Sequence, residues 1–269
     1  MSLLRDERAA ASFSRPALTA ALFGVATARR RAAAFAHLAH DLAFVAGRAR
    51  DDVDRATTRR RTAVAAARLV EMLRRDGGGE RGREQRVWAA AALLPAVQSR
   101  LSNHMDLFTA ALRLLASREQ WRAWSAATAD FAVLGCFGLT EMAHGSNARG
   151  IETVAVYDPA DGGVTLHTPR PEAGKLWIGA AAATATHCLV YAQLLVVGDA
   201  ARHGIQPFLV QLRDVASGRV LPGIRICDAG PKMGRDGLDN GYLVFSHVRL
   251  ERGAMLCRYT ALAADGTVS

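Results

Sequence analysis

The chain has 269 residues, half of them apolar, so it is long enough to bury the core of one large or two ordinary domains. A formal net charge of +9 would suit nucleic acid or a membrane surface, but no basic run is interleaved with aromatic residues as a nucleic-acid platform requires. Composition therefore disfavours nucleic acid as a partner and stays compatible with a small ligand that carries phosphate.

The cysteines favour neither a metal site nor a disulfide framework. Cys136, Cys188, Cys227 and Cys257 lie far apart in the sequence and form no C-x-x-C pair, so reduced, mostly buried thiols are expected. No apolar run reaches the roughly 18 to 20 residues of a membrane span. The first eight residues lack the basic-then-apolar order of a secretory signal, so we expect an intracellular protein.

The segment from about Pro16 to Asp130 is rich in Ala, Leu and Arg and has few helix breakers, which predicts helices. Apolar residues recur there at intervals of three and four, as on the buried face of an amphipathic helix. Two such stripes are Leu69, Val70, Met72 and Leu73, and Leu107, Phe108, Ala111, Leu112 and Leu115.

Several residues predict where these helices begin and end. Asp76 to Gly79 supplies glycines for a left-handed C-cap, and the Arg-rich stretch from Arg81 to Arg86 is interpreted as a solvated turn. Ser117 is followed three residues later by Gln120, which is the capping-box spacing. A further helix should therefore begin after Ser117.

Near Phe131 glycines and β-branched residues become frequent, which predicts an all-β domain. The turn Asp158 to Gly163, with its proline and glycines, should join the strands Thr153–Tyr157 and Val164–His167 into a hairpin. The residues from Glu251 to Tyr259 are interpreted as the possible opening of a new helix. Further strands are expected at Cys188–Val197, Pro207–Leu212, Ile224–Cys227 and Tyr242–Val248.

A site-like segment lies at this boundary, from Gly135 to Asn147 with Arg149 to Thr153 behind it. It combines glycines with hydroxyl and amide side chains, so backbone N–H groups there can approach a ligand closely. The same residues also make ordinary turns, and composition leaves both interpretations open.

This segment resembles the corresponding run of the peroxisomal acyl-CoA oxidases, a family of flavin-dependent enzymes. Four blocks resemble that family in the same order along the chain, which makes the likeness more specific than any one block. The blocks are Leu4–Phe13 with Leu18 and Thr19; Leu139–Asn147 with Arg149–Thr153 and Tyr157–Pro159; Lys175–Gly179 with His187 and Ala192–Leu194; and Leu221–Ile224 and Gly230–Gly234 with Leu238–Tyr242 and Asp265–Thr267.

The resemblance implies an α+β protein: an N-terminal helical domain over residues 1–130 and a flavin-facing central β domain, a barrel or sandwich, over 131–250. Residues 251–269 would be a stub leading to the family's C-terminal helical domain, which this sequence does not contain. FAD is the implied cofactor. Thr140 would be the hydroxyl that contacts the flavin, and Gly179 the backbone position pressed against it.

The implied activity is oxidation of a fatty acyl-CoA to the trans-2-enoyl-CoA with reduction of dioxygen to hydrogen peroxide. The family's catalytic base is a glutamate of the C-terminal domain, so no catalytic residue is assigned here and the chain alone is expected to form no peroxide. Two hypotheses stay open: an oxidase whose remaining half comes from a separate polypeptide or was lost from the gene model, and a non-catalytic remnant that binds acyl-CoA, FAD or a partner chain. The resemblance implies a homodimer or a separate C-terminal chain as the protein partner. An acyl-CoA dehydrogenase is a third and less favoured possibility.

Other residues invite a chemical role that we do not assign. Glu141 and His144 could form an acid–base pair, but a surface or loop-bracing role is preferred. Asp239 and Asn240 are interpreted as a turn that fixes the last hairpin. Trp177 could pack near the cofactor or in the core, and the core is preferred. The family's second glycine after the tryptophan pair and its later lysine are Ala180 and Ala183 here, which would weaken flavin affinity. The resemblance implies a peroxisomal location, although Thr267–Ser269 is no peroxisomal signal.

Overall fold

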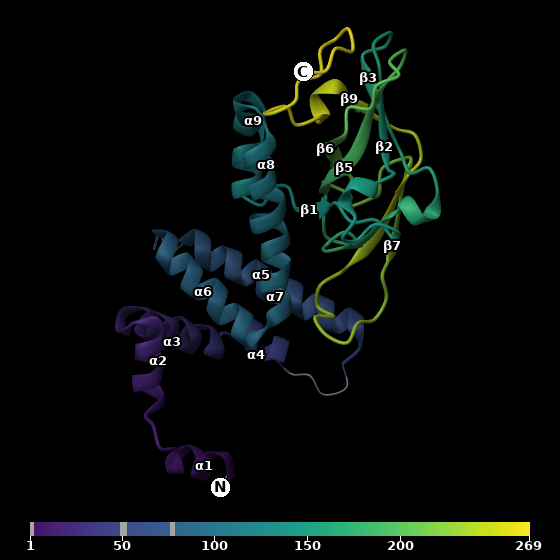
Figure 1. Ribbon diagram of the computed structural model, residues 1–269. Helices are drawn as coiled ribbons and strands as arrows, with labels where there is room; N and C mark the ends of the chain where they lie inside the picture. The colour runs from purple at the N-terminus through teal and green to yellow at the C-terminus, as the bar shows by residue number, and fades with distance from the viewer. Residues whose placement is uncertain (1–2, 49–52, 76–78) are drawn as a thin grey trace. The chain divides into compact units, whose positions relative to one another are not determined.

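The computed structural model describes residues 3–48, 53–75 and 79–269, which form two compact units (Figure 1). The first unit extends to Gln98 and the second begins at Ser99. Helices give way to strands where the sequence predicted, because α9 ends at Ala129 and β1 begins at Gly135. The α+β class is therefore confirmed. Three helical segments that precede the first strand nevertheless belong to the same compact unit as the sheets.

The first unit is helical, and α5 supplies the predicted apolar stripe to its core. Leu69 and Met72 of α5 are buried, as the spacing predicted. The predicted glycine C-cap lies outside the described residues. The predicted turn at Arg81 to Arg86 is wrong, because those residues continue a helix. The helices are α1 (Leu3–Ala10), α2 (Arg15–Phe23), α3 (Val25–His40), α4 (Leu42–Arg48), α5 (Arg55–Arg75), α6 (Gly79–Leu93) and α7 (Pro95–Ser102), the last of which continues into the second unit.

The second unit opens with three helical segments, η1 (Asn103–Thr109), α8 (Ala110–Leu115) and α9 (Arg118–Ala129). The segment η1 is a π-helix, a form that is rare and often marks functional sites. The capping box at Ser117 is confirmed, since Ser117 and Gln120 exchange side-chain and backbone hydrogen bonds. No helix in the described ranges is long and apolar enough to cross a membrane.

Nine strands of the second unit form two sheets. The larger sheet has the order β1-β5-β2-β3-β9 with β6 paired to β5, and the smaller one has the order β4-β8-β7. The predicted hairpin is confirmed, whereas the residues from Glu251 to Tyr259 contain one short 3₁₀ turn instead of a helix. The strands are β1 (Gly135–Gly138), β2 (Val154–Asp158), β3 (Gly163–His167), β4 (Lys175–Ile178), β5 (His187–Val196), β6 (Ile205–Gln211), β7 (Ile224–Asp228), β8 (Gly241–Phe245) and β9 (Val248–Glu251).

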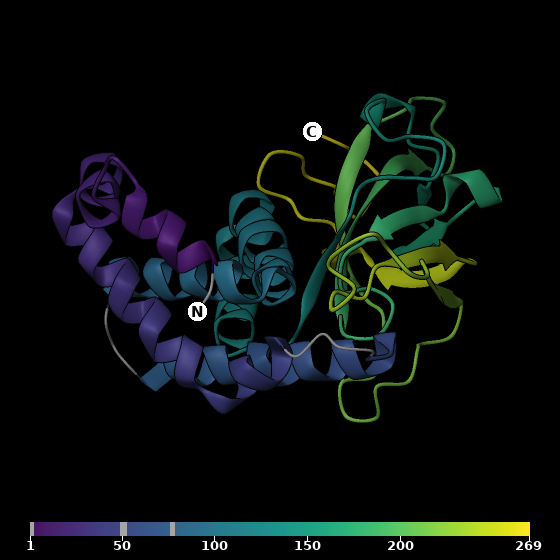
Figure 2. The same ribbon diagram turned by 90° about the horizontal axis from the view of Figure 1, so that it is seen from below.

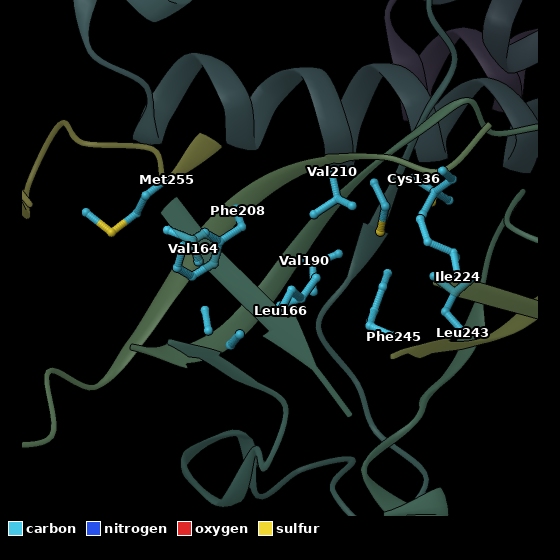
Figure 3. Close-up of a cluster of buried hydrophobic side chains, with 14 of the residues drawn as sticks. Cys136, Val164, Leu166, Val190, Phe208, Val210, Ile224, Leu243, Phe245 and Met255 are labelled. Carbon is cyan, nitrogen blue, oxygen red and sulfur yellow. The ribbon is translucent and has the colours of Figure 1, made fainter. Parts of the chain in front are cut away.

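The strands bury two different faces. Figure 2 shows them curling around the space that the main core fills. In Figure 3 Phe208 and Met255 lie at one end of this core, and Ile224 and Phe245 of the smaller sheet lie at the other. The opposite face of β5 and β6 packs on α8 and α9 (Figure 1). Successive side chains of β6 therefore point into different cores: Phe208 and Val210 pack in the main core, and Leu209 packs against the helices.

Two buried histidines join the helices of this unit to its sheet. His104 of η1 donates from Nε2 to the carbonyl of Thr128 at 2.9 Å, and its Nδ1 accepts from the Gly135 N–H at 3.1 Å. This arrangement requires a neutral ring, and burial lowers the pKa of His104. Burial also lowers the pKa of His187, at the start of β5, to about 4.

We predict that acid weakens this unit well before its carboxylates titrate. Both imidazoles take up a proton more readily in the unfolded chain, so the free energy of unfolding rises with pH and falls as pH drops from about 6.5 towards 4. The slope should approach about 1.4 kcal/mol per pH unit for each histidine. Urea unfolding at pH 7, 6 and 5 measures it. A slope that is unchanged in His187→Gln would contradict the assignment to that ring.

Candidate functional site

The candidate site is built where the chain leaves β1 and runs antiparallel to the segment that enters β4. Thr140 and Leu176 exchange two hydrogen bonds: the Leu176 N–H donates to the Thr140 carbonyl at 3.0 Å, and Thr140 Oγ1 donates to the Leu176 carbonyl at 2.8 Å. The Met142 N–H donates to the Gly174 carbonyl at 3.0 Å. These bonds bring two of the predicted sequence blocks, Leu139–Asn147 and Lys175–Gly179, side by side.

A fully buried lysine lies beneath this contact. Lys175 Nζ donates to Glu141 Oε1 at 3.0 Å, to the Tyr191 carbonyl at 2.7 Å and to the Leu139 carbonyl at 3.2 Å. Both charged side chains are entirely buried. An ammonium has three donors, and all three are used, so burial leaves none of them unsatisfied.

Glu141 accepts hydrogen bonds from several other groups. The Thr153 hydroxyl and the N–H groups of Glu152 and Thr153 donate to its carboxylate at 2.6 to 2.9 Å, and His144 Nδ1 lies 3.0 Å from Oε2. Burial alone would raise the pKa of Glu141, but Lys175 and these donors outweigh it and lower that pKa. Glu141 is therefore a buried residue that braces the surrounding loops. Of the two roles preferred from the sequence, loop bracing agrees with the structure and a surface position does not.

Next to this brace the protein exposes an aromatic ring. Trp177 leaves 59% of its surface accessible, so its assignment to the core is wrong. Its backbone has φ of 66°, a left-handed conformation that few bulky residues adopt. Ala180 also has a left-handed backbone, with φ of 67°. Strained positions of this kind cluster at functional sites.

The two predicted flavin residues lie in different surroundings. Thr140 is exposed beside β4, and its hydroxyl donates to the Leu176 carbonyl. Gly179 is buried, and a Cβ there would overlap the side-chain amide of Asn103. Asn103 is itself held by a 2.7 Å bond from Nδ2 to the Ser99 carbonyl. The glycine is thus explained by a contact inside the protein, and a ligand is not required to account for it.

Asp239 does more than shape a turn. It is completely buried, accepts from the N–H groups of Ala183 and Thr184 at 2.8 Å, and pairs with Arg100 at 3.1 Å. Arg100 also donates to the carbonyl of Gly237 at 2.8 Å. Asp239 therefore holds the loop that follows Gly179, and Ala183 takes part through its backbone.

Sequence reasoning did not assign roles to Lys175, Arg100 or Asn103, and it gave Asn240 only a place in a turn. One signal was present: only two of the 34 basic side chains are lysines, Lys175 and Lys232, and both make buried or partly buried contacts here. A compact ammonium suits three converging oxygens better than a planar guanidinium does. The described residues contain no group of three or more His, Cys, Asp or Glu side chains that would hold a metal ion.

We predict that Lys175→Met lowers the free energy of unfolding by about 3–5 kcal/mol, because it leaves the Glu141 carboxylate buried without its counter-charge. Chemical denaturation measures the loss. Arg249→Met is a matched control, since it removes the exposed ion pair with Asp161 and should cost less than about 1 kcal/mol. Equal losses for the two variants would contradict the role of the buried pair.

We also predict that Gly179→Ala destabilises the flavin-free chain by about 1–3 kcal/mol, because the added methyl group meets Asn103. Combining it with Asn103→Ala should recover most of that loss. Thermal unfolding of the two single variants and the double variant measures the coupling. Additive losses would show that Asn103 is not what excludes a side chain at position 179.

The segment that carries Thr140 and Gly179 is similar in sequence to known proteins. Residues 136–248 match the acyl-CoA dehydrogenase middle domain. The chain is 43% identical over 178 residues to acyl-coenzyme A oxidase 4 of Candida tropicalis, covering 65% of this chain and 25% of that protein. It is 45% identical over 135 residues to human peroxisomal acyl-coenzyme A oxidase 3, covering 50% and 19%.

Solved structures extend the likeness to nearly the whole chain. Acyl-CoA oxidase 3 of Yarrowia lipolytica superimposes with a TM-score of 0.89 at 34% identity, covering 99% of this chain and 38% of that one. Acyl-CoA oxidase-2 of Caenorhabditis elegans, solved with FAD, ascaroside-CoA and ATP, gives 0.85 at 30% identity, covering 99% and 40%. The chain thus spans about a quarter of the length of the curated relatives. Sequence and fold together show that this chain is similar to part of the acyl-CoA oxidases and carries a match to the acyl-CoA dehydrogenase middle domain.

Proposed function

We propose that this chain forms the flavin-facing wall of an acyl-CoA oxidase, with Thr140 and Gly179 as its flavin contacts. The observation that supports this most is the exposed Trp177, held in a left-handed conformation next to the exposed Thr140. An isoalloxazine ring has a broad apolar face and hydrogen-bonding atoms along its edge. An accessible indole and a hydroxyl on adjoining segments fit those two features.

The chain's own residues would bind and orient the cofactor. Thr140 Oγ1 donates its proton to the Leu176 carbonyl, and its lone pairs would remain able to accept a hydrogen bond. Beneath it, Lys175 uses all three of its ammonium donors and Glu141 accepts several hydrogen bonds, and these contacts restrain the segment that carries Thr140. Gly179 would contribute through its backbone, since Asn103 fills the space on its Cβ side.

The whole reaction is part of the same proposal. A fatty acyl-CoA would be desaturated to the trans-2-enoyl-CoA and dioxygen reduced to hydrogen peroxide, and bound FAD would supply the redox chemistry that links the two. The family likeness and the FAD and CoA ligand present in the Caenorhabditis elegans structure support it. A base, a homodimer partner and a peroxisomal location are carried over from the family in the same way, the last with support from the human peroxisomal relative.

Binding of FAD by the purified chain tests the proposal directly. We expect a yellow protein whose flavin affinity falls about tenfold in Thr140→Val, because that substitution keeps the shape and removes one hydrogen bond of about 1–1.5 kcal/mol. Calorimetric titration with FAD measures the dissociation constants.

Thr267→Val is the control, because it removes another exposed threonine hydroxyl away from the site. Equal affinities for Thr140→Val and the unaltered chain would remove Thr140 from the site. Absence of FAD binding by the unaltered chain would count against the flavin-facing wall and favour the alternative of a non-catalytic remnant.

A further inference from the structure

A buried asparagine holds the backbone of the exposed tryptophan. Asn240, just before β8, is 5% exposed and donates from Nδ2 to the Trp177 carbonyl at 3.0 Å. Its Oδ1 accepts from Lys232 Nζ at 2.9 Å, and the same ammonium donates to the Leu238 carbonyl at 2.6 Å. One amide side chain thus connects β4 to the loop that precedes β8.

The orientation of this amide follows from the chemistry of its neighbours. The Lys232 ammonium can only donate, so it must face the amide oxygen. The amide NH₂ then points the other way, towards the Trp177 carbonyl, which can only accept. Lys232 therefore selects the rotamer in which Asn240 can hold Trp177.

The held residue lies in an irregular part of the sheet. Lys175 pairs with Leu243 and Ile178 pairs with Gly241, so β4 has one more residue than β8 between these two pairs. Trp177 lies in this bulge with φ of 66°. Glycine is the usual residue at a left-handed bulge position, and bulges often redirect a side chain next to an active site. Here a tryptophan occupies the position and its ring is turned outward.

We propose that Asn240, oriented by Lys232, is a positioning residue that keeps Trp177 in this bulge with its ring towards the ligand-binding face. A tryptophan exposed by chance would not explain why its carbonyl accepts a hydrogen bond from Asn240 while Lys232 orients the Asn240 amide. The consequence for flavin affinity rests on the proposed function, whereas the restraint on the ring does not. The proposal can therefore be tested on the ring and on the cofactor separately.

Fluorine NMR of the chain labelled with 5-fluorotryptophan reports on each of its four tryptophans. Trp177→Phe identifies the Trp177 resonance by its loss. Asn240→Asp keeps an acceptor for Lys232 and removes the donor to Trp177, so it should shift or broaden that resonance while leaving those of Trp121 and Trp124 in place. Lys232→Met lets the amide rotate and should produce a smaller change of the same kind.

Gln193→Met is the matched control, because it also removes a side-chain amide that donates to one carbonyl, that of Ile151 at 3.1 Å. It should leave the Trp177 resonance unchanged. FAD affinity should fall about tenfold in Asn240→Asp, because the variant loses one hydrogen bond that holds Trp177 in place. The affinity should stay constant in the control.

An unchanged Trp177 resonance in Asn240→Asp overturns the proposal. It is also overturned if the Trp121 and Trp124 resonances move as far, because the residue would then support the whole fold and not one ring. A wild-type chain that binds no FAD argues against the proposed function alone, since the resonance still reports whether Asn240 positions Trp177.

Discussion

The buried ion pair between Lys175 and Glu141 is the constraint on which the arrangement of this site depends. Four pieces of chain meet at it: the exit from β1, the entry to β2, the start of β4 and the backbone of β5 at Tyr191. Burying one charge alone would be very unfavourable, so these segments must come together for either charge to be buried. The pair favours one packing of them over looser alternatives.

From this interior anchor the chain places its candidate ligand-binding residues by short steps. Thr140 immediately precedes Glu141, and Trp177 follows Lys175 by two residues, so each exposed group is adjacent to a buried charge. Further restraints surround the bulge: Asn103 packs against Gly179, Asp239 holds the next loop, and Asn240 holds Trp177. Together they offset the strain of a left-handed tryptophan and preorganise its ring.

Local rules predicted much of the fold because they act within a few residues. The capping box at Ser117 and the hairpin around Asp158 to Gly163 depend on hydrogen bonds and turn geometry that the sequence contains. The failures have a different cause. The charged stretch at 81–86 has no apolar periodicity that would mark a helix, although arginine is compatible with one. The π-helix η1 lies in an apolar stripe whose spacing looks like that of an ordinary α-helix.

The sequence by itself determined the α+β class, six of the nine strands, the resemblance to acyl-CoA oxidases and the two segments that carry Thr140 and Gly179, whereas β1, β4 and β9 were not predicted. Tertiary structure alone decided what each residue does. Glu141 became a brace because Lys175, 34 positions away, is buried against it, and Gly179 is a glycine because Asn103 fills its side-chain space. Trp177 is exposed because pairing across two strands leaves it in a bulge. Such long-range contacts are set by packing and have no periodic signature in the chain.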